Sequence, residues 1–201
     1  MNKLLKIIGL VSFITIFTGC VNTTLPANKV YNLYTTGDCC NNGFTKQKLT
    51  LKILEPVTSK YLNNTSIYYS SDKYRLQTYK LSKWSDFPTK MILEVLTTKL
   101  DGLNLYENIT TSYIYAKSDY TLQSELLEFK QIIDNGNSYV MLKIKFYIIE
   151  DNRKNIVSRT FSYKTKCNST NAYGAVEGQN KSLELLIKDL SEWLYKYTKE
   201  K

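Results

Sequence analysis

The sequence predicts an α+β fold, a two-layer sandwich in which a mainly antiparallel sheet carries two amphipathic helices on one face. Between residues 121 and 164, apolar and polar residues alternate in three consecutive segments separated by turn sequences. This alternation is typical of an antiparallel meander with one covered face. Apolar residues recur at helical spacing in 82–103 and again in 171–201, and a single apolar stripe on each helix suits packing on the sheet.

The segments before residue 82 predict the first strands. Residues 29–35 are rich in strand-forming side chains, and residues 37–43 ("GDCCNNG") have the composition of a turn. Residues 47–56 alternate leucine and isoleucine with lysine and threonine and end at a proline, which predicts a half-buried strand. Segments 66–71 and 74–80 flank a short polar turn and predict a β-hairpin.

Residues 82–103 predict the first helix. Ser85 and Asp86 offer capping side chains, and Pro88 suits a first helical turn. Gly102 suits the end of the helix. We interpret Asp86 as a cap rather than as a general base. The buried stripe is expected to consist of Met91, Ile92, Val95, Leu96 and Leu100.

Three strands are predicted next, at 121–133, 139–149 and 156–164, joined by the turn sequences "DNGN" and "DNRK". We expect each strand to present its apolar residues on the covered face, with Lys143 and Lys145 on the other face. The residues expected on the covered face are Leu127, Phe129 and Ile133, then Val140, Leu142, Ile144, Phe146 and Ile148, and then Val157, Phe161 and Tyr163.

Residues 171–201 predict the second helix. Gly174 and Gly178 weaken its start, so we expect regular helix from about Glu177. Its apolar stripe is expected to consist of Ala172, Val176, Leu183, Ile187, Leu190, Leu194 and Tyr197.

The N-terminus predicts export. Residues 1–19 begin with lysines and continue with an apolar run at 7–17, which is shorter than the roughly 20 residues that a membrane-spanning helix needs. Thr18-Gly19-Cys20 resembles a bacterial lipobox, with Phe17 where an aliphatic residue is usual. We therefore predict a signal peptide at 1–19, acylation of Cys20 and a short tether at 20–28. The alternative is an ordinary signal peptide or N-terminal anchor with an incidental cysteine.

Composition excludes several kinds of site. The chain contains no histidine, which rules out Ser-His and Cys-His nucleophiles and histidine-ligated zinc or haem. Its glycines form no phosphate-binding loop. The net charge is +9, but the lysines are scattered among acids, which is typical of a solvated surface rather than of a nucleic-acid site. We expect the chain to have no enzymatic activity, no cofactor and no metal site.

Three cysteines remain once Cys20 is assigned to lipid. An exported chain meets an oxidising compartment, so we favour a disulfide between Cys167 and either Cys39 or Cys40. A site of three metal-binding thiolates is the alternative, and no fourth ligand is apparent in the sequence.

A few other residues were candidates for chemistry or contact. Glu125 and Glu128 lie three apart on a predicted strand, so we expect them on opposite faces, a poor carboxylate pair. We interpret Trp84 and Trp193 as packing groups. Tyrosines near the predicted hairpin form either a partner surface or cross-strand pairs, and the sequence does not decide between the two for Tyr68, Tyr69, Tyr74 and Tyr79.

The order of these segments carries a family resemblance. A strand pair reading roughly "I-Y…Y-x-L-x-x-Y" runs into "W-x-x-x-P" and an amphipathic helix, through Ile67, Tyr68, Tyr74, Leu76, Tyr79, Trp84 and Pro88. With the lipobox, the long meander and the terminal helix, this resembles the ABC-type transport auxiliary lipoproteins, which include PqiC-like proteins. The resemblance extends over residues 29–197. The chain departs from the pattern at Cys39-Cys40 and in the polar region 101–120.

The resemblance implies a domain at 29–201 that acts as a non-catalytic accessory of a transporter. In such systems an ATPase and a permease lie in the inner membrane, and an MCE-domain protein conducts phospholipid or another hydrophobic molecule between membranes. The chain would face the periplasm, with the outer membrane as the expected site of the anchor because Val21 and Asn22 include no aspartate retention signal. The alternatives are an envelope hydrolase acting on peptidoglycan or lipid, and a surface adhesin or nucleic-acid binder.

Overall fold

The computed structural model describes residues 27–35, 43–151 and 155–200. They form a nine-stranded sheet with two α-helices and a short 3₁₀ helix, η2. In chain order the elements are β1 (Lys29–Tyr31), β2 (Gln47–Ile53), β3 (Val57–Thr58), η2 (Lys60–Leu62), β4 (Ser66–Ser70), β5 (Gln77–Trp84), α2 (Pro88–Gly102), β6 (Tyr106–Thr111), β7 (Tyr120–Asp134), β8 (Asn137–Glu150), β9 (Ile156–Lys166) and α3 (Ala172–Lys199).

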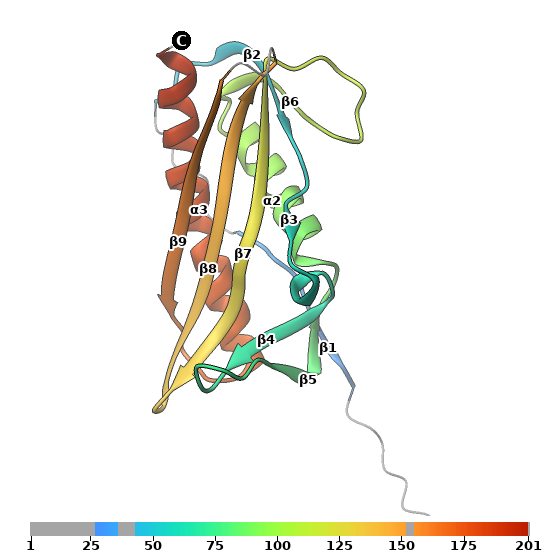
Figure 1. Cartoon of the computed structure of the whole chain (residues 1–201), viewed down its shortest axis with the longest axis vertical. Helices are drawn as coiled ribbons and strands as arrows, with labels where there is room; N and C mark the ends of the chain where they lie inside the picture. The colour runs from blue at the N-terminus through green and yellow to red at the C-terminus, as the bar shows by residue number, and fades with distance from the viewer. Residues whose placement is uncertain (1–26, 36–42, 152–154, 201) are drawn as a thin grey trace, which may run out of the picture.

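The long strand β7 organises the sheet. One of its edges pairs antiparallel with β8, which pairs antiparallel with β9, so the predicted meander is confirmed. Its other edge takes three short strands one after another, all parallel to it: β2 near Tyr120, β3 near Glu125 and β4 near Gln131. The sheet is therefore mixed. Short strands form two groups at opposite ends of β7, with β4, β5 and β1 at one end and β2 and β6 at the other (Figure 1).

At each end of β7, the short strand paired with it pairs in turn with a further strand. At one end β4 pairs antiparallel with β5 in the predicted hairpin, and β1 pairs parallel with β5, with Lys29 opposite Ser82. At the other end β2 pairs parallel with β6. Between Tyr120 and Ile132, β7 separates the two groups by about 40 Å at roughly 3.3 Å per residue. We call them the tether end (β1, β4 and β5) and the far end (β2, β6 and the loop 112–119).

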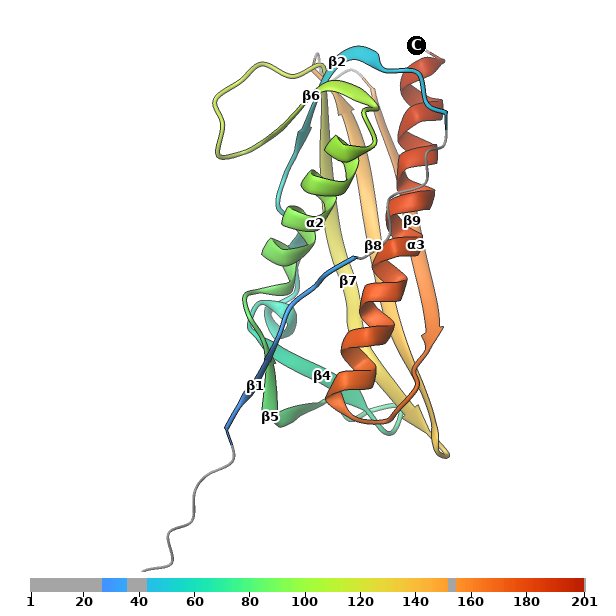
Figure 2. The same ribbon diagram turned by 180° about the vertical axis from the view of Figure 1, so that it is seen from behind.

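Both helices cover the same face of the sheet, as the sequence predicted (Figure 2). Five alternate residues of β8 form the centre of the core, and each has 0% of its surface exposed: Val140, Leu142, Ile144, Phe146 and Ile148. The α3 stripe around Leu183, Leu190 and Leu194 is buried in the same cluster. The predicted two-layer α+β fold is confirmed. Among the described helices, neither is long and apolar enough to cross a membrane.

The predicted faces of β7 are wrong in part, because the strand contains a β-bulge. The register with β8 shifts between Leu126 and Glu128, which leaves Leu127 as an extra residue outside the alternation. The buried apolar residues are Tyr120, Leu122, Leu126 and Phe129, while Leu127 is only half-buried. Ile133 shares the face of Phe129, as predicted, and is half-buried at the strand end. The bulge therefore changes which side chains reach the core.

The same bulge places Glu125 and Glu128 on one face of the sheet, which contradicts the prediction of opposite faces. Glu125 lies opposite Lys145 in the register and Glu128 opposite Lys143, two lysines that share the outer face of β8. Glu128 also forms an ion pair with Lys130, at 3.1 Å. Each carboxylate thus has a cation beside it.

The start of α3 was predicted too late. The helix begins at Ala172, and the side chain of Asn171 caps it by accepting a hydrogen bond from the backbone N–H of Gly174 at 3.0 Å. A Cβ at Gly178 would lie 2.9 Å from Val140 Cγ2 and 3.0 Å from Cys167 Sγ. Close packing on the sheet, rather than a weak helix start, accounts for this glycine.

The predicted caps of α2 are also wrong. Phe87 occupies the N-cap position with no side-chain cap, and Pro88 begins the helix as predicted. The Asp86 carboxylate instead accepts a hydrogen bond from the backbone N–H of Phe87, at 2.7 Å, and lies 3.8 Å from Lys90 Nζ. Ser85 Oγ donates to the Asn32 side-chain oxygen at 3.2 Å. The helix start is fixed by proline geometry and by contacts with the chain before it.

Candidate functional site

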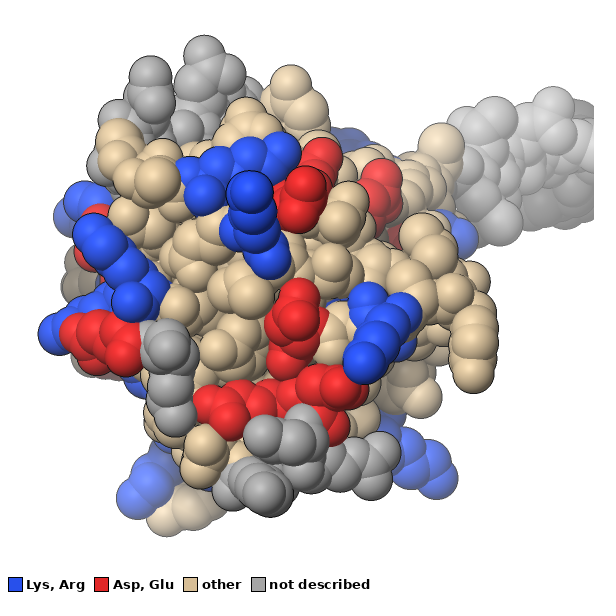
Figure 3. Space-filling view, turned by 90° about the horizontal axis from the view of Figure 1, so that it is seen from above, with Lys and Arg blue, Asp and Glu red and all other residues tan. Residues whose placement is uncertain are grey.

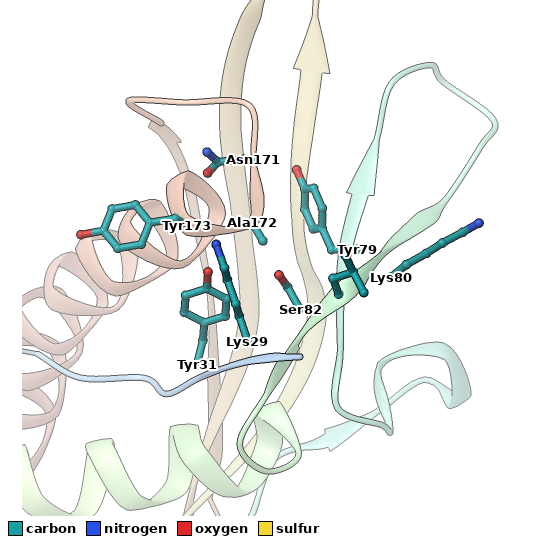
Figure 4. Close-up of a pocket in the computed structure, with 9 residues that line it drawn as sticks. Lys29, Tyr31, Tyr79, Lys80, Ser82, Asn171, Ala172 and Tyr173 are labelled. Carbon is teal, nitrogen blue, oxygen red and sulfur yellow. The ribbon is translucent and has the colours of Figure 1, made fainter. Parts of the chain in front are cut away.

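A pocket of about 340 Å³ lies at the tether end, between the edge strand β1, its neighbour β5 and the beginning of α3 (Figure 4). Three segments that are far apart in the sequence build it: β1, β5 and the N-terminus of α3. Its lining consists of Lys29, Tyr31, Tyr79, Lys80, Leu81, Ser82, Asn171, Ala172 and Tyr173.

Tyr79 is held in one orientation by a buried network. Its hydroxyl contacts the side-chain oxygen of Gln131 and lies 2.8 Å from the carbonyl oxygen of Thr170. Gln131 has 0% of its surface exposed, and its amide donates to Ser138 Oγ at 2.6 Å and to the Ser169 carbonyl at 3.1 Å. The network joins β5, β7, β8 and the segment before α3, so it fixes the wall of the pocket.

The pocket contains no acid–base pair. Burial is the main cause that raises the pKa of Tyr79 to about 12, so its hydroxyl stays protonated at neutral pH. No carboxylate lines the pocket, and Lys80 points away from it while Lys29 lies beside Tyr31 (Figure 4). A volume of about 340 Å³ is near the lower limit of roughly 300 Å³ for small-molecule sites. The lining offers hydroxyl, amide and ammonium groups that can hydrogen-bond a small polar group.

The far end carries a different feature, an exposed apolar loop. Residues 112–119 connect β6 to β7, and three consecutive side chains there are largely exposed: Tyr113 by 73%, Ile114 by 56% and Tyr115 by 109%. A second pocket of about 350 Å³ lies between Tyr113 and the outer side of α2. We call residues 112–119 the far-end loop.

Hydrogen bonds fasten the base of the far-end loop. The Asp119 carboxylate accepts from the backbone N–H of Thr50 at 2.7 Å, and the N–H of Asp119 donates to the Thr50 carbonyl at 2.9 Å. Lys52 Nζ donates to the carbonyl of Ala116 at 2.9 Å. The loop is thus held out from a fixed base. The sequence predicted only a polar region here, although the run Tyr113-Ile114-Tyr115 within it was a usable signal.

The structure resolves the two interpretations of the hairpin tyrosines residue by residue. The rings of Tyr69 and Tyr79 contact each other across the hairpin, at 4.6 Å between centroids, and Tyr68 packs on Tyr61 at 5.6 Å. These are packing pairs. Tyr74 differs, because 89% of it is exposed at the hairpin tip.

The two tryptophans pack as predicted. Trp84, with 2% of its surface exposed, contacts the ring of Phe129, and the half-buried Trp193 contacts Phe161.

The predicted cysteine sites are only partly within view. Cys20, Cys39 and Cys40 lie outside the described residues. Cys167 is buried, with 6% exposed, and lies directly after β9 against Gly178 of α3. The predicted disulfide stays a prediction. Within the described ranges, no group of three Cys, Asp or Glu residues could hold a metal ion.

Two of the solved structures similar to this chain show the same fold over most of its length. The protein XCC0632 from Xanthomonas campestris, of the DUF330 family, superposes with a TM-score of 0.76 at 14% identity, and the match covers 86% of this chain and 98% of that one. A second, titled only as an uncharacterized protein, gives a TM-score of 0.68 at 13% identity and covers 84% and 99% of the two chains. At identities this low the likeness shows the fold alone.

Sequence comparison identifies the family. No curated protein sequence matches the chain. The family model described as the ABC-type transport auxiliary lipoprotein component matches residues 31–191. This range includes β2 to β9, the whole of α2 and α3 as far as Ser191. The predicted resemblance is confirmed, and the chain belongs to the family of ABC-type transport auxiliary lipoproteins.

Proposed function

We propose that the chain is a non-catalytic accessory of an MCE-type ABC transporter that moves phospholipid or another hydrophobic molecule between the membranes of the envelope. Membership of the auxiliary lipoprotein family, matched over residues 31–191, is the observation that carries the proposal. The family implies a lipoprotein of the cell envelope that works with an ABC transporter. The MCE partner and the cargo are the steps that the proposal adds.

The proposal makes Cys20 the attachment point to a bilayer, with the outer membrane as the expected one. One acyl chain binds a membrane only marginally, whereas two or more hold a protein stably. The described chain starts at Ala27, immediately before β1 at the tether end. An anchor at Cys20 would therefore place the tether end toward the membrane and direct the far end away from it.

This orientation assigns the partner contact to the far-end loop. A protein held at a bilayer meets a partner at high effective concentration, so a modest contact is enough. Tyr113, Ile114 and Tyr115 form an exposed apolar run, and apolar and aromatic side chains dominate the energetics of protein interfaces. The contact would add no chemistry to the transporter and would serve to position it.

The non-catalytic part of the proposal rests on the surroundings of the acidic residues. Glu125 and Glu128 share a face, but each lies opposite a lysine on an open strand surface. An envelope hydrolase would need either a clustered pair of carboxylates in one cleft or an activated serine. No carboxylate lines the tether-end pocket, and the raised pKa of Tyr79 keeps its hydroxyl protonated.

A single substitution tests the anchor. In Cys20→Ser, labelling with a radioactive or clickable fatty acid should be lost, and the chain should no longer sediment with membranes after processing. Cys167→Ser serves as the matched control and should keep both. Labelling that persists in Cys20→Ser would show that the acylation site is elsewhere.

Affinity purification tests the partner. The full chain, tagged at its C-terminus and solubilised in mild detergent, should bring down an MCE-domain protein together with an ABC ATPase and permease. The phospholipid content of that complex, measured by mass spectrometry, identifies the cargo class. Recovery of an ABC transporter without any MCE protein would contradict the finer part of the proposal.

We also propose the disulfide between Cys167 and either Cys39 or Cys40 as a structural staple of the exported form. Peptide mapping of the non-reduced protein should find Cys167 linked to one of them. A free Cys167 in protein isolated from the envelope would exclude it.

A further inference from the structure

The tether end carries exposed apolar and basic side chains on β1, β5 and the hairpin tip. Four of its apolar side chains are exposed: Tyr74 by 89%, Val30 by 55%, Leu81 by 48% and Leu76 by 41%. Exposed cations lie among them on the same two strands and hairpin tip, namely Lys29, Lys73, Arg75, Lys80 and Lys83. We call these nine residues the tether-end surface.

The charge of this surface is strongly one-sided. Between Ser66 and Trp84 the chain contains four cationic residues and one acid, Asp72. Asp72 pairs with Arg75, at 2.9 Å, and accepts hydrogen bonds from the backbone N–H groups of Tyr74 and Arg75, both at 2.9 Å. The acid is used to shape the turn, so the remaining lysines determine the charge that the surface presents.

The hairpin tip is held in a form that projects Tyr74. The Ser70 hydroxyl lies 2.8 Å from the Arg75 carbonyl, which closes the turn across its base. The Lys73 ammonium lies 5.6 Å from the centre of the Tyr74 ring. An exposed tyrosine beside lysines is the side-chain combination found where proteins meet the headgroup layer of a membrane.

The position of the chain start identifies the occupant. The described chain begins at Ala27, and Lys29 lies beside Ser82 in the sheet. Seven residue steps separate Cys20 from Ala27, and at ~3.5 Å each they reach at most about 25 Å. If Cys20 carries lipid, as the proposed function requires, Ala27, at the β1 side of the tether-end surface, is held within this distance of the bilayer.

We propose that the tether-end surface lies on the anionic headgroups of the same bilayer that holds the lipid anchor. Lysines and Arg75 contact lipid phosphates, while Tyr74 and Leu76 enter the headgroup layer. The sheet then stands on its hairpin end, and the far-end loop points away from the bilayer. A free-hanging domain on a flexible tether would have no such fixed orientation.

Photo-crosslinking of the full acylated chain tests the contact. A benzophenone amino acid replaces Tyr74 in one variant and Tyr115, the most exposed tyrosine of the far-end loop, in the other. Both variants are reconstituted through their own acyl chains into vesicles of phosphatidylethanolamine with or without phosphatidylglycerol. We expect phospholipid adducts at position 74 at least about fivefold above position 115, and fewer adducts at 74 without phosphatidylglycerol. Equal yields at the two positions would overturn the proposal.

A matched charge series tests the electrostatic part. The triple variant Lys73→Gln, Lys80→Gln and Lys83→Gln should lower the adduct yield at position 74 severalfold. The triple variant Lys46→Gln, Lys48→Gln and Lys117→Gln removes the same charge from exposed far-end positions and should leave the yield unchanged. Circular dichroism shows whether each variant is folded. A similar loss in both series would reduce the effect to net charge and contradict a specific surface.

The other outcomes are equally decisive. Adducts to a second copy of the chain or to another protein at position 74 would assign the surface to that partner. Loss of the lipid adducts when RNA is added before irradiation would favour a nucleic-acid site. Fatty-acid labelling reports the anchor separately, so an acylated chain without adducts refutes only this inference. If the chain is not acylated, flotation with phosphatidylglycerol vesicles tests whether the tether-end surface binds lipid. Binding that is lost in the triple variant Lys73→Gln, Lys80→Gln and Lys83→Gln supports the proposal. Absence of binding by the wild-type chain refutes it.

Discussion

The two ends of β7 are built alike and present opposite surfaces. Each end carries a short strand parallel to β7, β4 at the tether end and β2 at the far end, and each short strand pairs with one more strand. At the tether end the cations lie among exposed apolar side chains. At the far end basic and acidic side chains gather together (Figure 3).

The acids of the far end hold the fold together. Asp119 binds Thr50 through both its carboxylate and its backbone N–H, and its carbonyl accepts from the N–H of Asp151 at 3.0 Å. Glu150 accepts from the Tyr197 hydroxyl at 3.1 Å, which ties the end of β8 to the last turns of α3. At the far end, Asp119 and Glu150 thus bind within the fold, while the loop presents apolar side chains to the outside.

The difference teaches that one sheet can separate two binding tasks by distance. The tether end contains the start of the described chain, a pocket and the basic surface, while the far end contains the exposed loop. A tether at one end gives the molecule a near side and a distant side with respect to a bilayer. Substitutions at the two ends should therefore have separable effects.

The largest effect is expected where α3 packs on the tether half of β8. In Gly178→Val the new side chain would overlap Val140 and Cys167, since a Cβ alone would already lie 2.9 Å and 3.0 Å from their side-chain atoms. We expect a loss of ~2–3 kcal/mol in the free energy of unfolding from this overpacking. Urea denaturation followed by circular dichroism measures it.

Gly102, the last residue of α2, provides the control. A Cβ there would meet nothing within 4 Å. Gly102→Ala should leave the free energy of unfolding unchanged or raise it by up to about 1 kcal/mol, because alanine favours the helix and restricts the unfolded chain. Equal losses in the two variants would contradict close packing as the reason for Gly178.

Gly178 also shows where prediction from the sequence fails. Low helix propensity at Gly174 and Gly178 predicted a late start, but tertiary packing and the Asn171 cap start the helix at Ala172. The bulge at Leu127 was equally hidden, because the run "ELLEF" places apolar residues in both possible registers. Local pattern cannot choose between registers when the deciding contacts come from a distant strand.

The features that the sequence predicted well are those whose pattern repeats over many neighbouring residues. The alternation of β8 from Val140 to Ile148, the hairpin and the stripes of both helices repeat one signal over many residues. The parallel pairing of β1, β2 and β4 has no local signature, because it depends on segments far apart in the chain. The tether-end pocket combines β1, β5 and α3 and was unpredictable for the same reason.

A matched pair of tyrosines compares the ends through their pH dependence. Burial raises the pKa of Tyr79 at the tether end and of Tyr106 at the far end to about 12 in each case. The folded state keeps these phenols protonated above pH 10, where the unfolded chain loses its protons. Stability is therefore fully present below about pH 10 and falls as the pH rises toward 12.

Replacing either tyrosine by phenylalanine should flatten part of that fall. At neutral pH, Tyr79→Phe should cost about 1–2 kcal/mol, because it leaves the buried Gln131 amide without its hydroxyl partner. Tyr106→Phe removes a weaker contact of 3.3 Å with Thr198 and should cost about 0.5–1 kcal/mol. Denaturant titrations at pH 7, 10 and 11.5 measure both effects. A variant that declines as steeply as the wild type above pH 10 would exclude its tyrosine as a contributor.

The smallest effect on stability is expected in the far-end loop. Ile114→Ser changes a side chain that is 56% exposed, so the free energy of unfolding should change by less than about 0.5 kcal/mol. If the loop is the partner contact, the same variant should reduce co-purification of the transporter severalfold while fatty-acid labelling and the lipid adducts at position 74 stay at wild-type levels. Leu76→Ser at the tether end should give the reverse pattern, with fewer lipid adducts and unchanged co-purification. Two variants that both lose transporter and lipid contact would show that the ends act as one surface and that distance along β7 does not separate the two tasks.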